Sequence, residues 1–188
     1  MSTRCSKGAM IVAGAIATLL IPGTISAQTP VKEGTTARLE VPRTVRAEHE
    51  MLHLTLMEAT KAPGRVGTSA QALAAVLEPH FLREEQMAMP LLGLLAPMAA
   101  GATVPDAVAA QARTMSETLR REMTSMLDEH KKVEAAVNAL RQAAVAERTT
   151  KFQQLAEDLA RHAQLEEDVM YPAAVLVGDL LRARQAGR

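Results

Sequence analysis

The pattern His-x-x-x-Glu-Glu-x-x-x-x-Pro occurs twice in the chain, at residues 80–90 and at residues 162–172. Residues four apart on an α-helix lie one above the other on the same face, so the His and the first Glu of each copy can bind one metal ion from a single turn. The pairs are His80 with Glu84 and His162 with Glu166. Two copies predict two metal ions or one shared pair.

The repeat extends beyond this pattern. An offset of 82 residues relates its two copies, and an offset of 81 residues relates Glu48-His49 to Glu129-His130. We interpret the chain as one helical hairpin used twice, each copy bringing a Glu-His element and then a His-x-x-x-Glu element. Pairing the copies gathers four histidines and two carboxylates at one level of a bundle.

The composition agrees with such a bundle. Apolar residues make up 48% of the chain and aromatic residues only 2%, with Ala, Leu and Met dominant, which is typical of an all-α domain. The formal net charge is +0 and no basic stripe is present. Nothing in the sequence therefore favours nucleic acid or an anionic membrane surface as a partner.

The N-terminal residues are typical of a secretory signal peptide. Arg4 and Lys7 precede an uncharged run, residues 8–21, which is shorter than the about 20 residues of a membrane span. We expect cleavage to remove residues 1–27, giving an exported, periplasmic protein without stable membrane insertion. The only cysteine, Cys5, leaves with the signal, so a metal in the mature chain must use N and O ligands.

Residues 28–41 are polar and predict a flexible linker, and residues 42–188 predict a single helical domain. Apolar stripes and end signals predict four helices in this domain. The first runs from about Pro42 to Lys61, the second begins near Thr68, the third runs from Pro105 to about Ala146, and the fourth begins at Thr150. Short or Gly/Pro-marked connections predict antiparallel neighbours.

Capping and proline signals refine these helices. Thr68 with Gln71, and Thr150 with Gln153, predict capping boxes at two helix starts. Pro90 and Pro172 each lie ten residues after a motif His, and each predicts either a kink or a helix break.

The motif residues fall on the apolar stripes that predict the inward faces of the helices. A single inward His is usually a hydrogen-bonded core residue, and a single inward Glu is usually paired with Arg or Lys. No Arg or Lys shares these stripes, and unpaired buried carboxylates are costly, so a bound cation is the simplest explanation. The set is His49, His80, His130, His162, Glu84 and Glu166. Glu85 and Glu167 are turned about 100° away, which favours solvent exposure or support of a ligand over direct binding.

These residues resemble the hemerythrin-like, or HHE cation-binding, family. Its signature is a His on the first helix, His-x-x-x-Glu on the second, a His on the third and His-x-x-x-Glu on the fourth, and the resemblance covers residues 42–181. The resemblance implies an up-down-up-down antiparallel four-helix bundle that holds a non-haem di-iron centre. It also implies that Glu84 and Glu166 bridge two iron ions.

The resemblance is incomplete at two positions. Oxygen-carrying members have a fifth His ligand from a His-x-x-x-His pair on the third helix, whereas this chain has that spacing on the first helix, His49 with His53, and Glu134 on the third. His53 and Glu134 are therefore candidates for additional metal ligands. A carboxylate at Glu134 would favour iron handling or redox chemistry over reversible oxygen carriage.

Two other kinds of metal site fit part of this pattern. His49-Glu50-x-x-His53 matches the His-Glu-x-x-His pattern of zinc metallopeptidases, but a peptidase leaves the duplicated His-x-x-x-Glu pattern unexplained. Ferritin-like oxidases also hold two metals in a helical bundle, but their sites contain more carboxylates than imidazoles. The excess of His in this chain favours a hemerythrin-type centre with room for a small ligand such as O₂ or NO.

The sequence therefore predicts an exported hemerythrin-like protein that binds O₂ or iron, or senses O₂. The alternative is a di-iron redox enzyme that acts on peroxide, NO or O₂, and a metal-stabilised structural domain is a third class. An oxidase usually needs redox-active side chains near the metal, and the chain has no Trp and only Tyr171. That composition favours binding over turnover.

Overall fold

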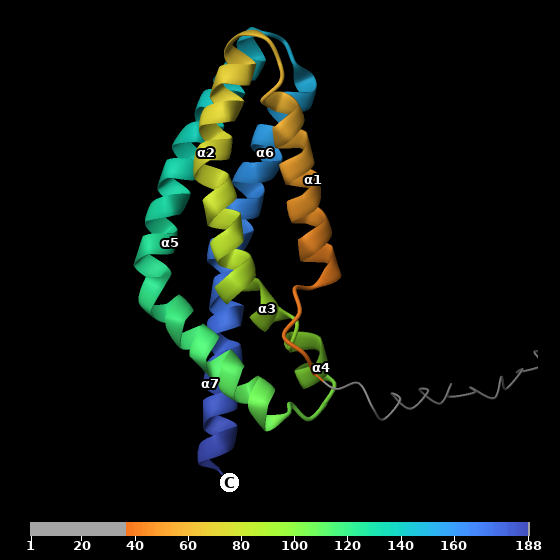
Figure 1. Cartoon of the computed structure of the whole chain (residues 1–188), viewed down its shortest axis with the longest axis vertical. Coiled ribbons are helices and arrows are strands. Elements are labelled where there is room, and N and C mark those ends of the chain that lie inside the picture. Colours follow the sequence, from red (N-terminus) through yellow and green to blue (C-terminus); the bar gives the residue numbers. More distant parts are fainter. Residues whose placement is uncertain (1–36, 188) are drawn as a thin grey trace, which may run out of the picture. The chain divides into compact units, whose positions relative to one another are not determined.

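The computed structural model describes residues 37–187, and in this range all regular structure is helical (Figure 1). The elements are α1 (Arg43–Ala59), α2 (Gly64–Met87), α3 (Met89–Leu92), α4 (Leu95–Ala99), α5 (Asp106–Ala146), α6 (Thr150–Leu165), a π-helical turn η1 (Glu166–Met170) and α7 (Tyr171–Ala186). The all-α prediction is confirmed. The predicted signal peptide lies outside the described residues.

The long helix α5 organises the bundle. It packs against α2 and α6 over one half of its length and against α7 over the other, while α1 packs against both α2 and α6 (Figure 1). None of the helices in the described range is both long and apolar enough to cross a membrane.

The apolar core has two parts. One lies among α1, α2, α6 and the C-terminal half of α5, and includes Leu56, Leu73 and Leu140. The other lies among α3, α4, α7 and the N-terminal half of α5, and includes Leu94 and Leu119. On every long helix the predicted ligands fall between these parts, so the two cores enclose a buried polar layer.

The domain begins earlier than the expected boundary at Pro42. Ala37 is buried, and Leu39 and Val41 pack against the core around α3 and α4. Gly93 makes this possible, because a Cβ on Gly93 would overlap the carbonyl oxygen of Glu40. The flexible linker predicted over residues 28–41 is therefore corrected at its C-terminal end, and residues 28–36 lie outside the described range.

Helix α2 begins at Gly64, four residues before the predicted start, and Thr68 is not its N-cap. The carboxylate of Glu147, just after α5, accepts hydrogen bonds from the backbone N–H of Arg65 (2.6 Å) and Val66 (3.4 Å). A carboxylate at the N-terminus of a helix accepts hydrogen bonds from its free N–H groups and interacts favourably with the positive end of the helix dipole. The cap comes from a distant segment, so the local pattern pointed to the wrong residue.

The start of α6 was predicted correctly at Thr150, but the capping box does not form. Thr149 is the N-cap residue, without a side-chain capping bond. Gln153 instead donates to the carbonyl oxygen of Ala144 at 3.1 Å, at the end of α5. This bond ties the two helices across their connection.

The two repeated prolines have different effects. After Met87 the chain leaves α2, and Pro90 lies in the first turn of the short helix α3. Pro172 lies in the first turn of α7, which continues from α6 through η1. A proline lacks the N–H of a helical hydrogen bond, and the wider π-helical turn η1 accommodates this loss. The chain therefore stays helical from α6 into α7, whereas α2 ends before Pro90.

Candidate metal centre

The polar layer holds all six residues of the predicted core ligand set. His49 comes from α1, His80 and Glu84 from α2, His130 from α5, His162 from α6 and Glu166 from η1. Each residue is at most 3% exposed. Burial this deep is exceptional for carboxylates and requires compensation by opposite charge.

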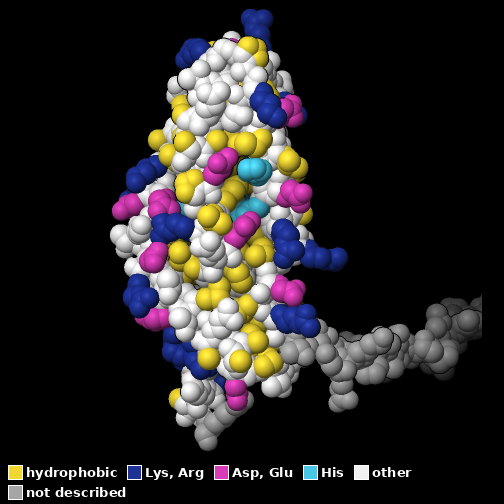
Figure 2. Space-filling view, viewed as in Figure 1, with side chains coloured by type: hydrophobic (Ala, Val, Ile, Leu, Met, Phe, Trp, Pro, Cys, Tyr) yellow, Lys and Arg dark blue, Asp and Glu magenta, His cyan; other side chains and the backbone are white. Residues whose placement is uncertain are grey.

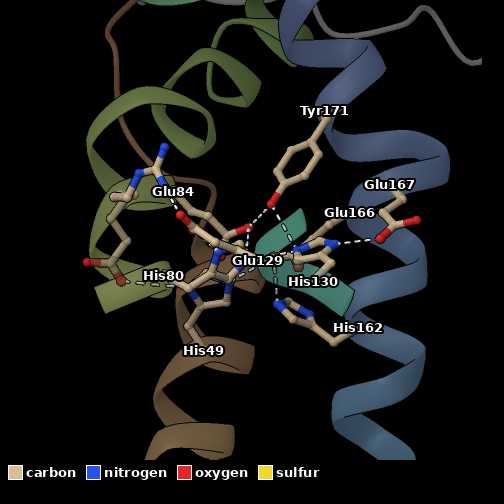
Figure 3. A network of polar contacts seen from close by, with 11 residues as sticks. His49, His80, Glu84, Glu129, His130, His162, Glu166, Glu167 and Tyr171 are labelled. Carbon is tan, nitrogen blue, oxygen red and sulfur yellow. Dashed lines mark hydrogen bonds and ion pairs between the residues drawn. The ribbon is translucent and has the colours of Figure 1, made fainter. Parts of the chain in front are cut away.

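The six residues form two groups that share Glu166 (Figure 3). The four-ligand group contains His80, Glu84, His130 and Glu166, and the three-ligand group contains His49, His162 and Glu166. Within each group the candidate ligand atoms lie within 4.8 Å of one another. This spacing is suited to one cation per group.

Glu166 presents one oxygen to each group. Its Oε2 lies 3.4 Å from His130 Nε2, while its Oε1 lies 3.0 Å from His162 Nε2 and 3.5 Å from His49 Nε2. If each group held a cation, Glu166 could donate one oxygen to each. Glu84, which the family resemblance also implied as a bridge, belongs only to the four-ligand group.

Several buried atoms of the layer have no hydrogen-bond partner among the described residues. They are both ring nitrogens of His49 and of His162, Glu84 Oε2 and Glu166 Oε1. Arg83, the cation next to Glu84 in sequence, pairs instead with Glu122 and Glu129. Among these atoms, the Nε2 atoms of His49 and His162 and the two carboxylate oxygens are donors of the kind that fit a transition-metal ion such as iron.

The layer binds protons strongly in the absence of a metal. Burial lowers the pKa of His80, but the contacts with Glu84 and Glu129 outweigh it and raise the pKa to about 9. Burial raises the pKa of Glu84. Although burial acts in the same direction on Glu166, its three histidine neighbours hold the pKa of that carboxyl well below its usual range. The pKa values of His130 and His162 are also raised by contacts with carboxylates that outweigh burial, so a metal ion must displace protons from these three histidines.

An outer ring of four glutamates surrounds the histidines. The Nδ1 atoms face these carboxylates while the Nε2 atoms face inward, as Figure 3 shows for His80 with Glu129 and for His130 with Glu167. The Nδ1-to-carboxylate distances are 2.7 Å for His130–Glu167, 3.0 Å for His80–Glu129, 3.4 Å for His162–Glu48 and 3.7 Å for His49–Glu85. A carboxylate on Nδ1 fixes the tautomer whose Nε2 can bind metal.

The outer ring follows the sequence repeat. The repeat relates the Glu48–His162 pair to Glu129–His80, and Glu85–His49 to Glu167–His130. The supporting role considered for Glu85 and Glu167 agrees with these contacts. Glu48 and Glu129 were not assigned a role from sequence, although their place directly before a ligand His in each copy was a usable signal.

Tyr171 was missed as a member of this site. Its side chain is 1% exposed, and its hydroxyl donates to Glu84 Oε1 and lies 3.1 Å from His130 Nε2 (Figure 3). Tyr171 is therefore a redox-active side chain within the candidate metal site, and the composition no longer favours binding over turnover. The repeat places Met89 at the corresponding position of the other copy, so the motif alone gave no signal.

His53 and Glu134 are not brought into the layer. Both side chains are exposed, and neither belongs to a ligand group among the described residues. The structure therefore does not support them as additional ligands. No group of three or more candidate ligands among the described residues contains both His49 and His53, so the His-Glu-x-x-His pattern forms no three-ligand zinc site there.

Two surface grooves of similar volume reach the layer. The Phe81 groove, about 540 Å³, ends on His49, and the Ala163 groove, about 510 Å³, ends on His130. Each residue that lines the first has its repeat counterpart in the second, including His53 with Glu134 and Glu85 with Glu167. Figure 2 shows histidine side chains among acidic and apolar ones on the face where α1 and α2 lie side by side.

A helical bundle with a buried layer of histidines and carboxylates defines a metal-binding helical protein. The chain matches the family described as "Hemerythrin HHE cation binding domain" over residues 41–174, and it therefore belongs to the hemerythrin family. Comparison with curated proteins and with solved structures gives no match.

Proposed function

We propose that this protein is an exported hemerythrin-like protein whose buried layer holds a non-haem di-iron centre, and that it binds O₂ or iron. The observation that carries the proposal is Glu166, which directs one oxygen to each ligand group. Two cations, one in each group, would offset the negative charges of Glu84 and Glu166. They would also bind atoms of both groups that have no hydrogen-bond partner.

The same proposal includes the four-helix topology of the family. In this interpretation α2 to α4 form an interrupted second helix, and α6, η1 and α7 form a continuous fourth helix. With α1 and α5 they make an up-down-up-down antiparallel bundle. Each of its four helices then supplies one histidine to the polar layer.

Binding of a small diatomic ligand is favoured by the surroundings of the three-ligand group. That group has fewer protein donors than its neighbour, which leaves iron positions for O₂ or NO. Apolar side chains adjoin the layer, among them Leu52, Leu77 and Leu159. Iron supplies the redox chemistry when bound, and these side chains exclude water and stray protons from it.

Metal analysis is the first test. Protein purified without chelators from cells supplied with iron should contain two iron ions per chain, and His80→Ala and His162→Ala should lose much of this iron together with thermal stability. Glu134→Ala, at an exposed position, is the matched control and should keep its iron. Protein that carries one zinc ion and no iron would contradict the di-iron proposal.

A second measurement separates binding from turnover. Reduced protein exposed to air should develop a visible absorption change that persists for minutes and reverses when oxygen is removed. Iron that loads and releases without such a change supports iron binding instead. For the proposed export, the mass of the mature protein should correspond to cleavage after Ala27.

A di-iron redox enzyme acting on peroxide, NO or O₂ is the second candidate, and the position of Tyr171 favours it. A buried phenol next to two ligand atoms could supply an electron or a proton to a substrate. Rapid irreversible oxidation of the reduced protein, with catalytic loss of added peroxide or NO, would select this function over binding.

A further inference from the structure

Tyr171 occupies a position in the polar layer that its repeat counterpart does not share. It is the first residue of α7 and the only tyrosine in the chain. Its ring stacks on His130 with centroids 5.5 Å apart and planes 26° from parallel. This stacking directs the hydroxyl toward the four-ligand group rather than toward solvent (Figure 3).

The spacing of the polar atoms around Tyr171 is that of donors around one metal ion. An octahedral ion with bonds of about 2.1 Å keeps neighbouring donors about 3.0 Å apart. His130 Nε2 lies 2.8 Å from His80 Nε2 and 3.1 Å from the Tyr171 hydroxyl. The same hydroxyl also contacts Glu84 Oε1. The phenol oxygen thus lies close enough to these donor atoms to bind the same ion.

We propose that Tyr171 is a fifth ligand of the four-ligand group, binding its metal ion through the phenolate oxygen beside His80, Glu84, His130 and Glu166. The inference rests on the proposed iron centre. It makes the two groups unequal: one has five protein donors and the other has three, so a small ligand is directed to the ion held by His49 and His162.

Binding through oxygen requires one proton to leave. The O–H bond of Tyr171 would break as the oxygen–metal bond forms, with Glu84, which accepts the hydroxyl's hydrogen bond, as the nearest proton acceptor. In the net reaction one proton would be released to the buffer for each ion bound in this way. No electron is transferred in this step. Burial and the charges of Glu84 and Glu166 raise the pKa of Tyr171, so the metal-free hydroxyl is protonated. A bound cation reverses the sign of this local field.

The single tyrosine makes the test specific. The full-length protein, stripped of metal and reloaded with ferric citrate, should show a visible phenolate-to-iron(III) charge-transfer band, because no other phenol is present. Tyr171→Phe keeps the stacked ring and should lose the band completely. Met89→Leu, a conservative change at the repeat counterpart, should keep it. The wild type should also release one more proton per chain on loading than Tyr171→Phe does.

Iron content measured in the same samples separates the possible failures. A wild-type protein that holds two iron ions but shows no band, and releases no additional proton, overturns the assignment of Tyr171 while leaving the iron centre intact. Tyr171 would then act only as a hydrogen-bond donor that positions Glu84. A wild-type protein that binds no iron overturns the proposed function and this inference together.

Discussion

The Phe81 groove ends on His49 beneath an aromatic ring, whereas the Ala163 groove ends on His130 beside a methyl group. The ring of Phe81 stacks on His49 with centroids 4.4 Å apart and planes 11° from parallel, whereas the described residues that line the Ala163 groove include no Phe, Tyr or Trp. On the far side of His130 the stacking partner is instead Tyr171.

The two grooves show which side chains follow the sequence repeat and which do not. Ligands, outer glutamates and groove positions follow the repeat, so both halves can hold a cation. The aromatic side chains differ between the halves, since Phe81 corresponds to Ala163 and Tyr171 to Met89. The two ligand groups are therefore unequal: Phe81 covers the groove that leads to His49, and Tyr171 lies beside His130 in the other group.

The largest expected effect separates the shared carboxylate from the unshared one. Glu166→Gln should remove both iron ions, because both groups use this residue, whereas Glu84→Gln should leave one ion per chain in the three-ligand group. Elemental analysis measures the difference, with exposed Glu134→Gln as the control. Equal losses in the two variants would mean that the groups do not bind metal separately.

As the pH rises, the stability of the metal-free protein should decrease while its affinity for a metal ion increases. Unfolded histidine titrates near pH 6.5, while His80 titrates at about 9 in the folded protein. A raised pKa contributes stability that is fully present below about pH 6.5 and is lost as the pH rises through 9.

Over this same window the apparent affinity for cobalt(II) should increase, by at most about tenfold per pH unit for each proton that the ion displaces, because fewer protons remain on the ligands as the pH rises. Denaturant unfolding of the metal-free protein and competition with a chelator measure the two trends. Stability and affinity that change in the same direction would contradict the protonation assigned to His80.

The loss of metal affinity on substituting an outer glutamate should be larger where its carboxylate lies closer to the histidine Nδ1 atom. Glu167→Gln and Glu129→Gln, at the two shortest contacts, should weaken metal binding about 10- to 100-fold, since each removes the charge that orients a ligand histidine. Glu48→Gln and Glu85→Gln, at 3.4 and 3.7 Å, should have smaller effects. Chelator competition gives the ranking, and a reversed order would show that distance does not govern their contribution.

Exchanging the groove side chains should change access. Phe81→Leu uncovers His49 and should increase the rate at which a chelator removes metal, while Ala163→Phe should slow removal through the other groove. A several-fold change in rate is expected, with iron content at equilibrium little altered. Rates that are unchanged in both variants would show that neither groove is the route to the layer.

The smallest effects are expected at the exposed groove residues. His53→Ala and Glu134→Ala should retain wild-type iron content and stability within about 0.5 kcal/mol, as substitutions of exposed side chains usually do. His49→Ala and His130→Ala are the buried counterparts and should lose iron. If His53→Ala empties the site while His49→Ala does not, the grouping of ligands is wrong.

The sequence by itself determined the helical class, the ends of α5 and the six residues that meet in the polar layer. Each depends on local regularities: a four-residue spacing puts His80 over Glu84 whatever the rest of the chain does, and an apolar stripe determines which face turns inward. The repeat then predicted that the two copies would meet at one level.

Only the tertiary structure decided which side chains come together across helices. Glu147 caps α2 from more than 80 residues away, and the two repeated prolines behave differently because only the second follows a π-helical turn. Tyr171 reaches the ligands while His53 and Glu134 remain exposed. Spacing fixes positions along one helix, but contacts of about 3 Å between helices depend on the rotation and bend of each helix, which the local pattern does not encode.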